Sequence, residues 1–116
     1  FDGTSLLPIT LGDGSDTLPF CQIVDTDAKV TDVMKAAKSK EAAYMLKAQL
    51  LAAKLNLAMG DVPPTDAAAI APTIAAADAL LGSDSCTPET GKNEADRAAA
   101  LALISALDAF NNKYSP

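Results

Sequence analysis

The sequence predicts a mainly α-helical fold, a small bundle of about four helices with a central helix over residues 40–59 and an N-terminal β-hairpin or flap. Apolar residues recur at helical spacing from Thr31 onward, and alanine, the strongest helix former, supplies 24 of the 116 residues. Residues 1–30 are instead poor in alanine and rich in Gly, Pro, Thr and Asp. The length fits one domain, so we expect residues 1–116 to form a single unit.

The N-terminal 30 residues contain two short runs with β-strand character, residues 7–11 and 20–24. Gly12, Asp13, Gly14, Ser15 and Asp16 lie between them and favour a tight turn. The pattern predicts a hairpin. Because an isolated hairpin is only marginally stable in water, we expect it to pack against the helices that follow.

The helical part, residues 31–111, divides at capping residues and at Gly and Pro. Thr31, Ser39 and Thr65 are suitable N-caps, and Gly60 and Gly82 are suitable stops. Pro72 is expected to kink or split the third helical segment. These signals predict helices over 32–38, 40–59, 65–81 and about 93–111, a loop over 83–92, and a polar tail over 112–116.

The central helix carries two apolar faces when its residues are projected at 100° per residue. Between these faces lie two polar stripes with a spacing of seven, the lysines Lys40, Lys47 and Lys54 and the amides Gln49 and Asn56. A helix with two apolar faces packs against neighbours on both sides, which places this helix at the centre of the domain. We expect the lysine stripe to be its solvent-exposed face, and its three lysines are candidates for contact with an acidic protein partner.

The composition excludes several classes of function. The net charge of −6 argues against nucleic acid and anionic membrane surfaces, because both require a basic face. The sequence has no apolar run of 18 residues, so we expect no membrane insertion. Histidine is absent, which removes the usual general base and the His-assisted nucleophiles. We therefore expect no enzymatic activity and no cofactor.

Four aspartates near the hairpin are candidate ligands for Ca²⁺, because carboxylate oxygens are the ligands that this ion prefers. Their spacing does not match a twelve-residue calcium loop, so roles in turns and helix caps are favoured and no metal site is predicted. The same carboxylates allow an alternative function, a Ca²⁺-dependent carbohydrate-binding module or a carboxylate-dependent hydrolase. The four residues are Asp13, Asp16, Asp25 and Asp27.

The two cysteines, Cys21 and Cys86, are too few to build a four-thiolate metal site. In an oxidising compartment the simplest arrangement is a Cys21–Cys86 disulfide that ties the hairpin to the helical body. The alternative is a pair of reduced, buried thiols. The chain starts at Phe1, without Met, so we expect it to be processed or to be part of a longer protein.

Three segments resemble a poorly characterised family of secreted bacterial domains. They are residues 44–60, which include Ala-Gln-Leu-Leu-Ala-Ala-Lys-Leu-Asn, residues 74–81, and residues 107–112. In that family a T-x-G-[FY]-W-K-N-H element precedes a hairpin. Residues 6–12 of this chain match the sequence of that hairpin. The element is missing here, because the chain begins where it should end. The resemblance implies export and supports the disulfide, but it transfers no active site.

The function that we expect is a non-catalytic structural, adhesion or assembly module of an exported, extracellular or cell-surface protein. The absence of catalytic residue types, the acidic surface and the resemblance all favour it. Its partner would be another protein or a second copy of the chain. Segment exchange between copies is one route to such assembly.

Overall fold

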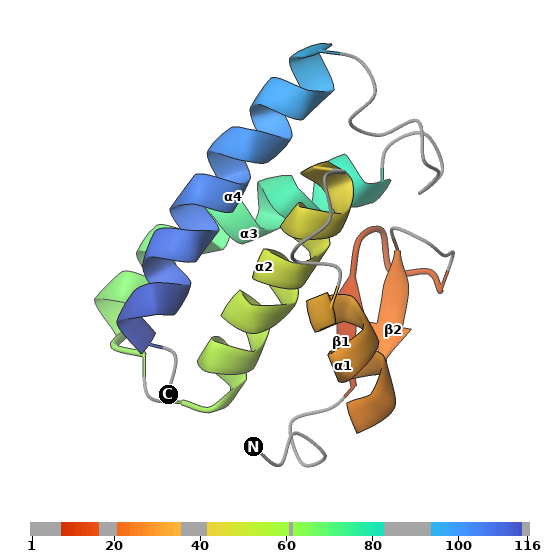
Figure 1. The fold of residues 1–116 in the computed structure, drawn as a ribbon. Coiled ribbons are helices and arrows are strands. Elements are labelled where there is room, and N and C mark those ends of the chain that lie inside the picture. Colours follow the sequence, from red (N-terminus) through yellow and green to blue (C-terminus); the bar gives the residue numbers. More distant parts are fainter. Residues whose placement is uncertain (1–7, 17–20, 36–41, 61, 83–93, 115–116) are drawn as a thin grey trace.

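The computed structural model describes residues 8–16, 21–35, 42–60, 62–82 and 94–114. In these residues the chain forms strands β1 (Ile9–Leu11) and β2 (Gln22–Val24) and helices α1 (Asp27–Lys35), α2 (Ala42–Ala58), α3 (Pro64–Gly82) and α4 (Glu94–Tyr114). Figure 1 shows α2 between the hairpin with α1 on one side and α3 with α4 on the other. The predicted helical bundle with an N-terminal hairpin is confirmed.

The two strands are antiparallel, and their register pairs Ile9 with Val24, Thr10 with Ile23, and Leu11 with Gln22. The predicted turn after β1 uses glycine where the backbone requires it, because Gly12 and Gly14 adopt φ angles of 96° and 94°. A two-stranded sheet cannot bury both of its faces alone. This one packs against the helices, as predicted, and β1 contacts α2 directly.

Helix α2 is the centre of the domain, as its two apolar faces predict. It contacts α1, α3, α4 and β1. The core around it is built largely from leucine and alanine, and the small alanine side chains let the helix backbones approach closely. The fully buried leucines and alanines are Leu11, Leu46, Leu50, Leu51, Leu81 and Leu107, together with Ala42, Ala43, Ala53, Ala77 and Ala100. Gly60, with φ of 83°, ends the helix as predicted.

Helix α1 begins at Asp27, five residues before the predicted start, so the assignment of Thr31 as its cap is wrong. Thr26 is the cap, because its Oγ1 accepts a 3.2 Å hydrogen bond from the Lys29 amide. Thr31 lies inside the helix, where its hydroxyl donates a 3.1 Å bond to the Asp27 carbonyl. Thr26 and Thr31, five residues apart, are both residue types that can cap a helix, and the bond from the Lys29 amide identifies Thr26 as the cap.

Helices α3 and α4 each extend beyond their predicted limits. Helix α3 continues through Pro72, so of the two predicted effects, a kink or a split, the split is wrong. Pro72 has no amide hydrogen, so the Ala68 carbonyl lacks its usual helical hydrogen bond. Both residues are exposed, and water can therefore bond to this carbonyl instead. Helix α4 ends at Tyr114, so residues 112–114 of the predicted tail are helical. The predicted loop over residues 83–92 lies outside the described residues.

We predict that Gly12→Ala destabilises the fold much more than Gly14→Ala. Both substitutions force alanine into a positive φ, which costs about 1–2 kcal/mol. A Cβ at Gly12 would also lie 2.3 Å from Sγ of Cys21, whereas a Cβ at Gly14 meets no atom within 4 Å. Urea unfolding should show a loss of about 2–5 kcal/mol for Gly12→Ala, because overpacking adds to the backbone strain. Equal losses for the two variants would contradict the described packing of Cys21 on Gly12.

Candidate functional site

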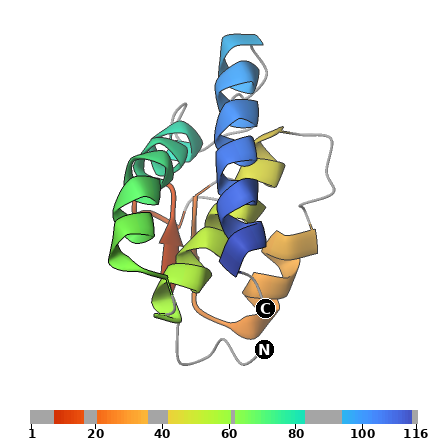
Figure 2. The ribbon, with the colours of Figure 1, turned by 90° about the vertical axis from the view of Figure 1, so that its left-hand side faces the viewer.

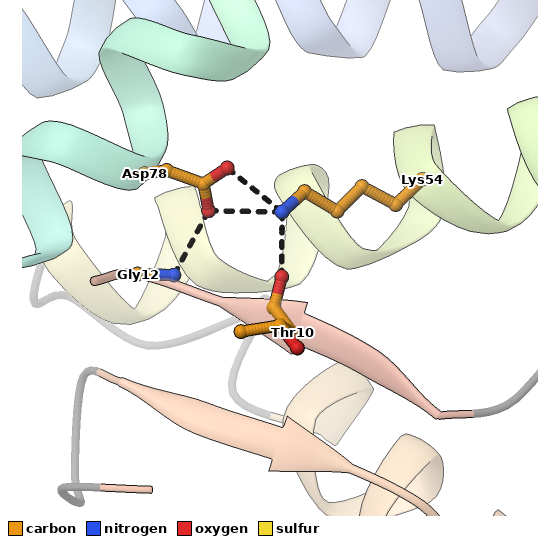
Figure 3. Close-up of polar contacts among 4 residues, drawn as sticks. All are labelled: Thr10, Gly12, Lys54 and Asp78. Atoms are coloured by element: carbon orange, nitrogen blue, oxygen red, sulfur yellow. Dashed lines mark hydrogen bonds and ion pairs between the residues drawn. The ribbon is translucent and has the colours of Figure 1, made fainter. Parts of the chain in front are cut away.

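The clearest polar site joins the hairpin to two helices, and we call its members Thr10, Gly12, Lys54 and Asp78 the hairpin clasp (Figure 3). Lys54 of α2 and Asp78 of α3 form an ion pair, with the lysine Nζ 2.8 and 3.0 Å from the two carboxylate oxygens. The same Nζ donates to the Thr10 carbonyl at 2.5 Å. The Gly12 amide donates to Asp78 at 2.8 Å. One half-buried ion pair therefore connects β1, α2 and α3.

The clasp occupies the outer edge of β1. Thr10 is paired with Ile23, whose amide turns away from β1 and donates a 3.0 Å bond to Asp16. In an antiparallel ladder both members of such a pair direct their backbone groups outward. Lys54 therefore bonds to the Thr10 carbonyl, and Asp78 to the Gly12 amide, two outward backbone groups that another strand could otherwise pair with. Asp16 does the same for the Ile23 amide of β2. Strand edges capped in this way resist pairing with further strands.

A second lysine of α2, Lys47, lies under the hairpin. Its side chain is only 5% exposed, and Nζ donates a 2.7 Å hydrogen bond to Oε1 of Gln22, which is also buried. Burial lowers the pKa of the Lys47 ammonium to about 8, and the negative charge of Asp16 opposes part of this shift.

The interpretation of the lysine stripe as a solvent-exposed face is therefore wrong for Lys47 and Lys54. Lys47 is buried under the hairpin, Lys54 is partly buried, and the ammonium groups of both bond to hairpin residues. They do not present a free basic surface to an acidic partner. Lys40, the third member of the stripe, lies outside the described residues.

The four candidate aspartates have separate local roles. Asp13 accepts bonds from the amide and hydroxyl of Ser15, which lower the pKa of its carboxyl group. Asp16 caps the β2 edge at Ile23. Asp25 pairs with Lys29 at 2.8 Å, which lowers the pKa of its carboxyl group, and Asp27 begins α1. Among the described residues, no group of three or more acidic, cysteine or histidine side chains is placed to hold a metal ion.

The amide stripe of α2 binds α4. Asn111 of α4 donates to the backbone carbonyl of Gln49 at 3.0 Å and to its side-chain oxygen at 2.8 Å. Asn56 donates a 3.0 Å bond to Asn111 in return. Gln49 also reaches Asp108, at 3.3 Å. These side-chain amides therefore hold the central helix against the last helix.

A shallow hollow of about 250 Å³ lies between the start of α3 and the end of α4. Ile70, Phe110 and Tyr114 line it, and the aromatic ring centroids of the last two are 5.0 Å apart. At its rim, Asp66 accepts bonds from Tyr114 and, at 2.9 Å, from Lys113. Figure 2 shows α3 and α4 on the same side of the molecule. Sequence reasoning missed this site because it depends on the last turn of α4, which the sequence led us to assign to a polar tail.

Cys21 lies fully buried just before β2. Its Sγ is 3.6 Å from the carbonyl oxygen of Leu81, near the end of α3. Cys86 lies outside the described residues, so its pairing with Cys21 stays a prediction.

Comparison with family models, with curated proteins and with solved structures finds no match to this chain. The resemblance to the secreted bacterial domains therefore stays a prediction. Across the described residues, none of the helices is long and apolar enough to cross a membrane.

We predict a strong energetic coupling between Lys54 and Asp78. Their side chains are only 21% and 24% exposed, so removing one partner leaves the other charge poorly solvated. A double-mutant cycle with Lys54→Met and Asp78→Ala should give a coupling of about 1–3 kcal/mol in urea unfolding.

Lys29 and Asp25 provide the matched control, because this ion pair, four residues apart at the start of α1, is 37% and 51% exposed. Its coupling should not exceed about 0.5 kcal/mol. A Lys54–Asp78 coupling as small as the control would show that the clasp does not hold the hairpin.

Proposed function

We propose that this chain is a non-catalytic structural, adhesion or assembly module of an exported or cell-surface protein. The observation that supports the proposal is that the buried polar side chains bond to one another across the fold. Those that lie buried among the described residues are Gln22, Lys47, Asn56 and Asn111. Each of them forms a hydrogen bond to a residue of another helix or strand. Gln22 of β2 bonds to Lys47 of α2, and Asn56 of α2 bonds to Asn111 of α4. Their hydrogen-bonding capacity is directed at holding the fold together rather than at an open cleft.

An exported location is supported by the predicted disulfide, since such bonds persist in oxidising compartments. The position of Cys21 favours it. Its Sγ lies beside the carbonyl of Leu81, and five residues of chain span at most about 17 Å, enough to bring Cys86 to this point. The bond would close a loop of about 65 residues and contribute roughly 4 kcal/mol through chain entropy. It would act at the same junction as the clasp.

We predict that the intact mass after alkylation shows no modified cysteine without reductant and two modified cysteines with it. Reduction should also lower the melting temperature markedly, because the expected contribution is comparable to the whole stability of a small domain. If both thiols alkylate without reductant, the disulfide is absent, and the proposed export loses this support.

Self-association is the form of assembly that can be tested on the chain alone. Leu101 of α4 is 41% exposed, and the other exposed residues between Arg97 and Asp108 are alanines and one serine. A face without charge avoids the repulsion that two copies of net charge −6 otherwise experience. The capped strand edges make α4 a better candidate surface than the hairpin.

We predict that the weight-average mass measured by light scattering rises with protein concentration. Leu101→Ser should reduce this rise, whereas Ala28→Ser, an exposed substitution on α1, should leave it unchanged. A strict monomer at high concentration would exclude self-association. In the same buffer, calorimetric titration with CaCl₂ tests the alternative calcium-dependent function, for which a saturable heat would be the required signal.

A further inference from the structure

The hollow between the start of α3 and the end of α4 combines an apolar wall, two aromatic rings and a carboxylate. Ile70 forms part of the wall, and the rings of Phe110 and Tyr114 lie beside it with centroids 5.0 Å apart and planes inclined by 50°. Phe110 is only 8% exposed, so the core holds its ring in place. The face of an aromatic ring carries partial negative charge and attracts cations. The hollow is therefore suited to a cation with an apolar part.

Asp66 supplies a full negative charge at the rim of the hollow. It lies in the first turn of α3, where the helix dipole favours an anion. The Tyr114 hydroxyl and the Lys113 ammonium both bond to its Oδ2. Among the described residues, no donor bonds to Oδ1. The carboxylate, whose side chain is 34% exposed, is therefore open to a further donor.

Lys113 shows that a cation is accommodated at this rim. Its Nζ lies 2.9 Å from Oδ2 of Asp66 and 5.5 Å from the centroid of the Tyr114 ring. The Lys113 side chain is 65% exposed, and an ion pair of this kind contributes little to stability. A cation from outside the chain can therefore replace the Lys113 ammonium on Asp66 at small cost, and the hollow of about 250 Å³ beside it can receive the attached carbon chain.

We propose that this hollow binds an arginine side chain of a protein partner. A guanidinium group is planar, so it can stack on an aromatic ring, and its fork of N–H donors can bond to both oxygens of one carboxylate. A lysine ammonium does neither. The methylene groups of the arginine would cover the apolar wall at Ala69 and Ile70. The net charge of −6 attracts a basic partner to the domain.

This proposal deepens the adhesion or assembly function proposed above and rests on it for the assignment of the arginine to a protein. The hollow includes Tyr114, which is thirteen residues, or about 20 Å, along α4 from Leu101. The alkylation and light-scattering experiments therefore examine other parts of the molecule. A failure of the arginine site and a failure of the proposed function can be told apart.

The test is an NMR titration of the whole chain with Nα-acetyl-arginine amide through the millimolar range. The backbone amide signals of Asp66, Ile70, Phe110 and Tyr114 should shift together and saturate. The citrulline analogue, which has a neutral urea in place of the guanidinium, should give no saturable shift. The lysine analogue should bind at least about threefold more weakly, because it lacks the planar fork. No saturable shift with the arginine probe, or equal binding of either analogue, would overturn the proposal.

Two matched pairs of variants separate the hollow from general charge attraction. Asp66→Asn should weaken arginine binding at least about tenfold. Asp25→Asn, which changes the net charge equally at an exposed ion pair on another helix, should leave it unchanged. Lys113→Gln removes the internal competitor and should strengthen binding about two- to fivefold, whereas Lys29→Gln should not. A gain in affinity cannot result from misfolding, so this pair decides the question even if Asp66→Asn unfolds. Equal effects within either pair would overturn the proposal.

Discussion

The bond between Lys54 and Asp78 is the interaction on which the arrangement of the domain depends. Helices α2 and α3 would pack through apolar side chains without it, but the hairpin has only three residue pairs of its own. Such a sheet needs both an apolar contact and partners for its outward backbone groups. The ion pair supplies those partners at Thr10 and Gly12 and at the same time fixes two helices relative to the strand. Lys47 adds a buried bond at the second strand.

The small side chains of the core explain why such polar links are needed. Alanine contributes little buried apolar area, so an alanine-rich interface gains less from the hydrophobic effect than one built from larger residues. Hydrogen bonds between neighbouring helices and strands fix how far each is shifted along the other. Asn111, which joins α4 to Gln49 and Asn56, has that role on the other side of α2. The central helix is thus connected by polar bonds to the hairpin on one side and to α4 on the other.

The helices and the hairpin could be predicted because their signals are local. Periodicity identifies α2 as a two-faced helix, and Gly60 ends it where expected. The wrong interpretations concern features that depend on distant residues. A helical projection shows that Lys47 and Lys54 share a stripe, but it contains no information about what covers that stripe. The predicted end of α4 is wrong for the same reason, because the bonds from Lys113 and Tyr114 reach Asp66 at the start of α3.

Native-state hydrogen exchange in the Asp78→Ala variant tests most directly whether the clasp holds the hairpin. The substitution removes the acceptor of the Gly12 amide and the partner of Lys54 together. If the clasp holds the hairpin, the amides of Leu11, Gly12 and Val24 should exchange at least about tenfold faster as a group, through a local opening that leaves the interior of α2 protected. Unchanged exchange at Leu11 and Val24, or equal acceleration at Leu50 in α2, would show that the clasp does not hold the hairpin.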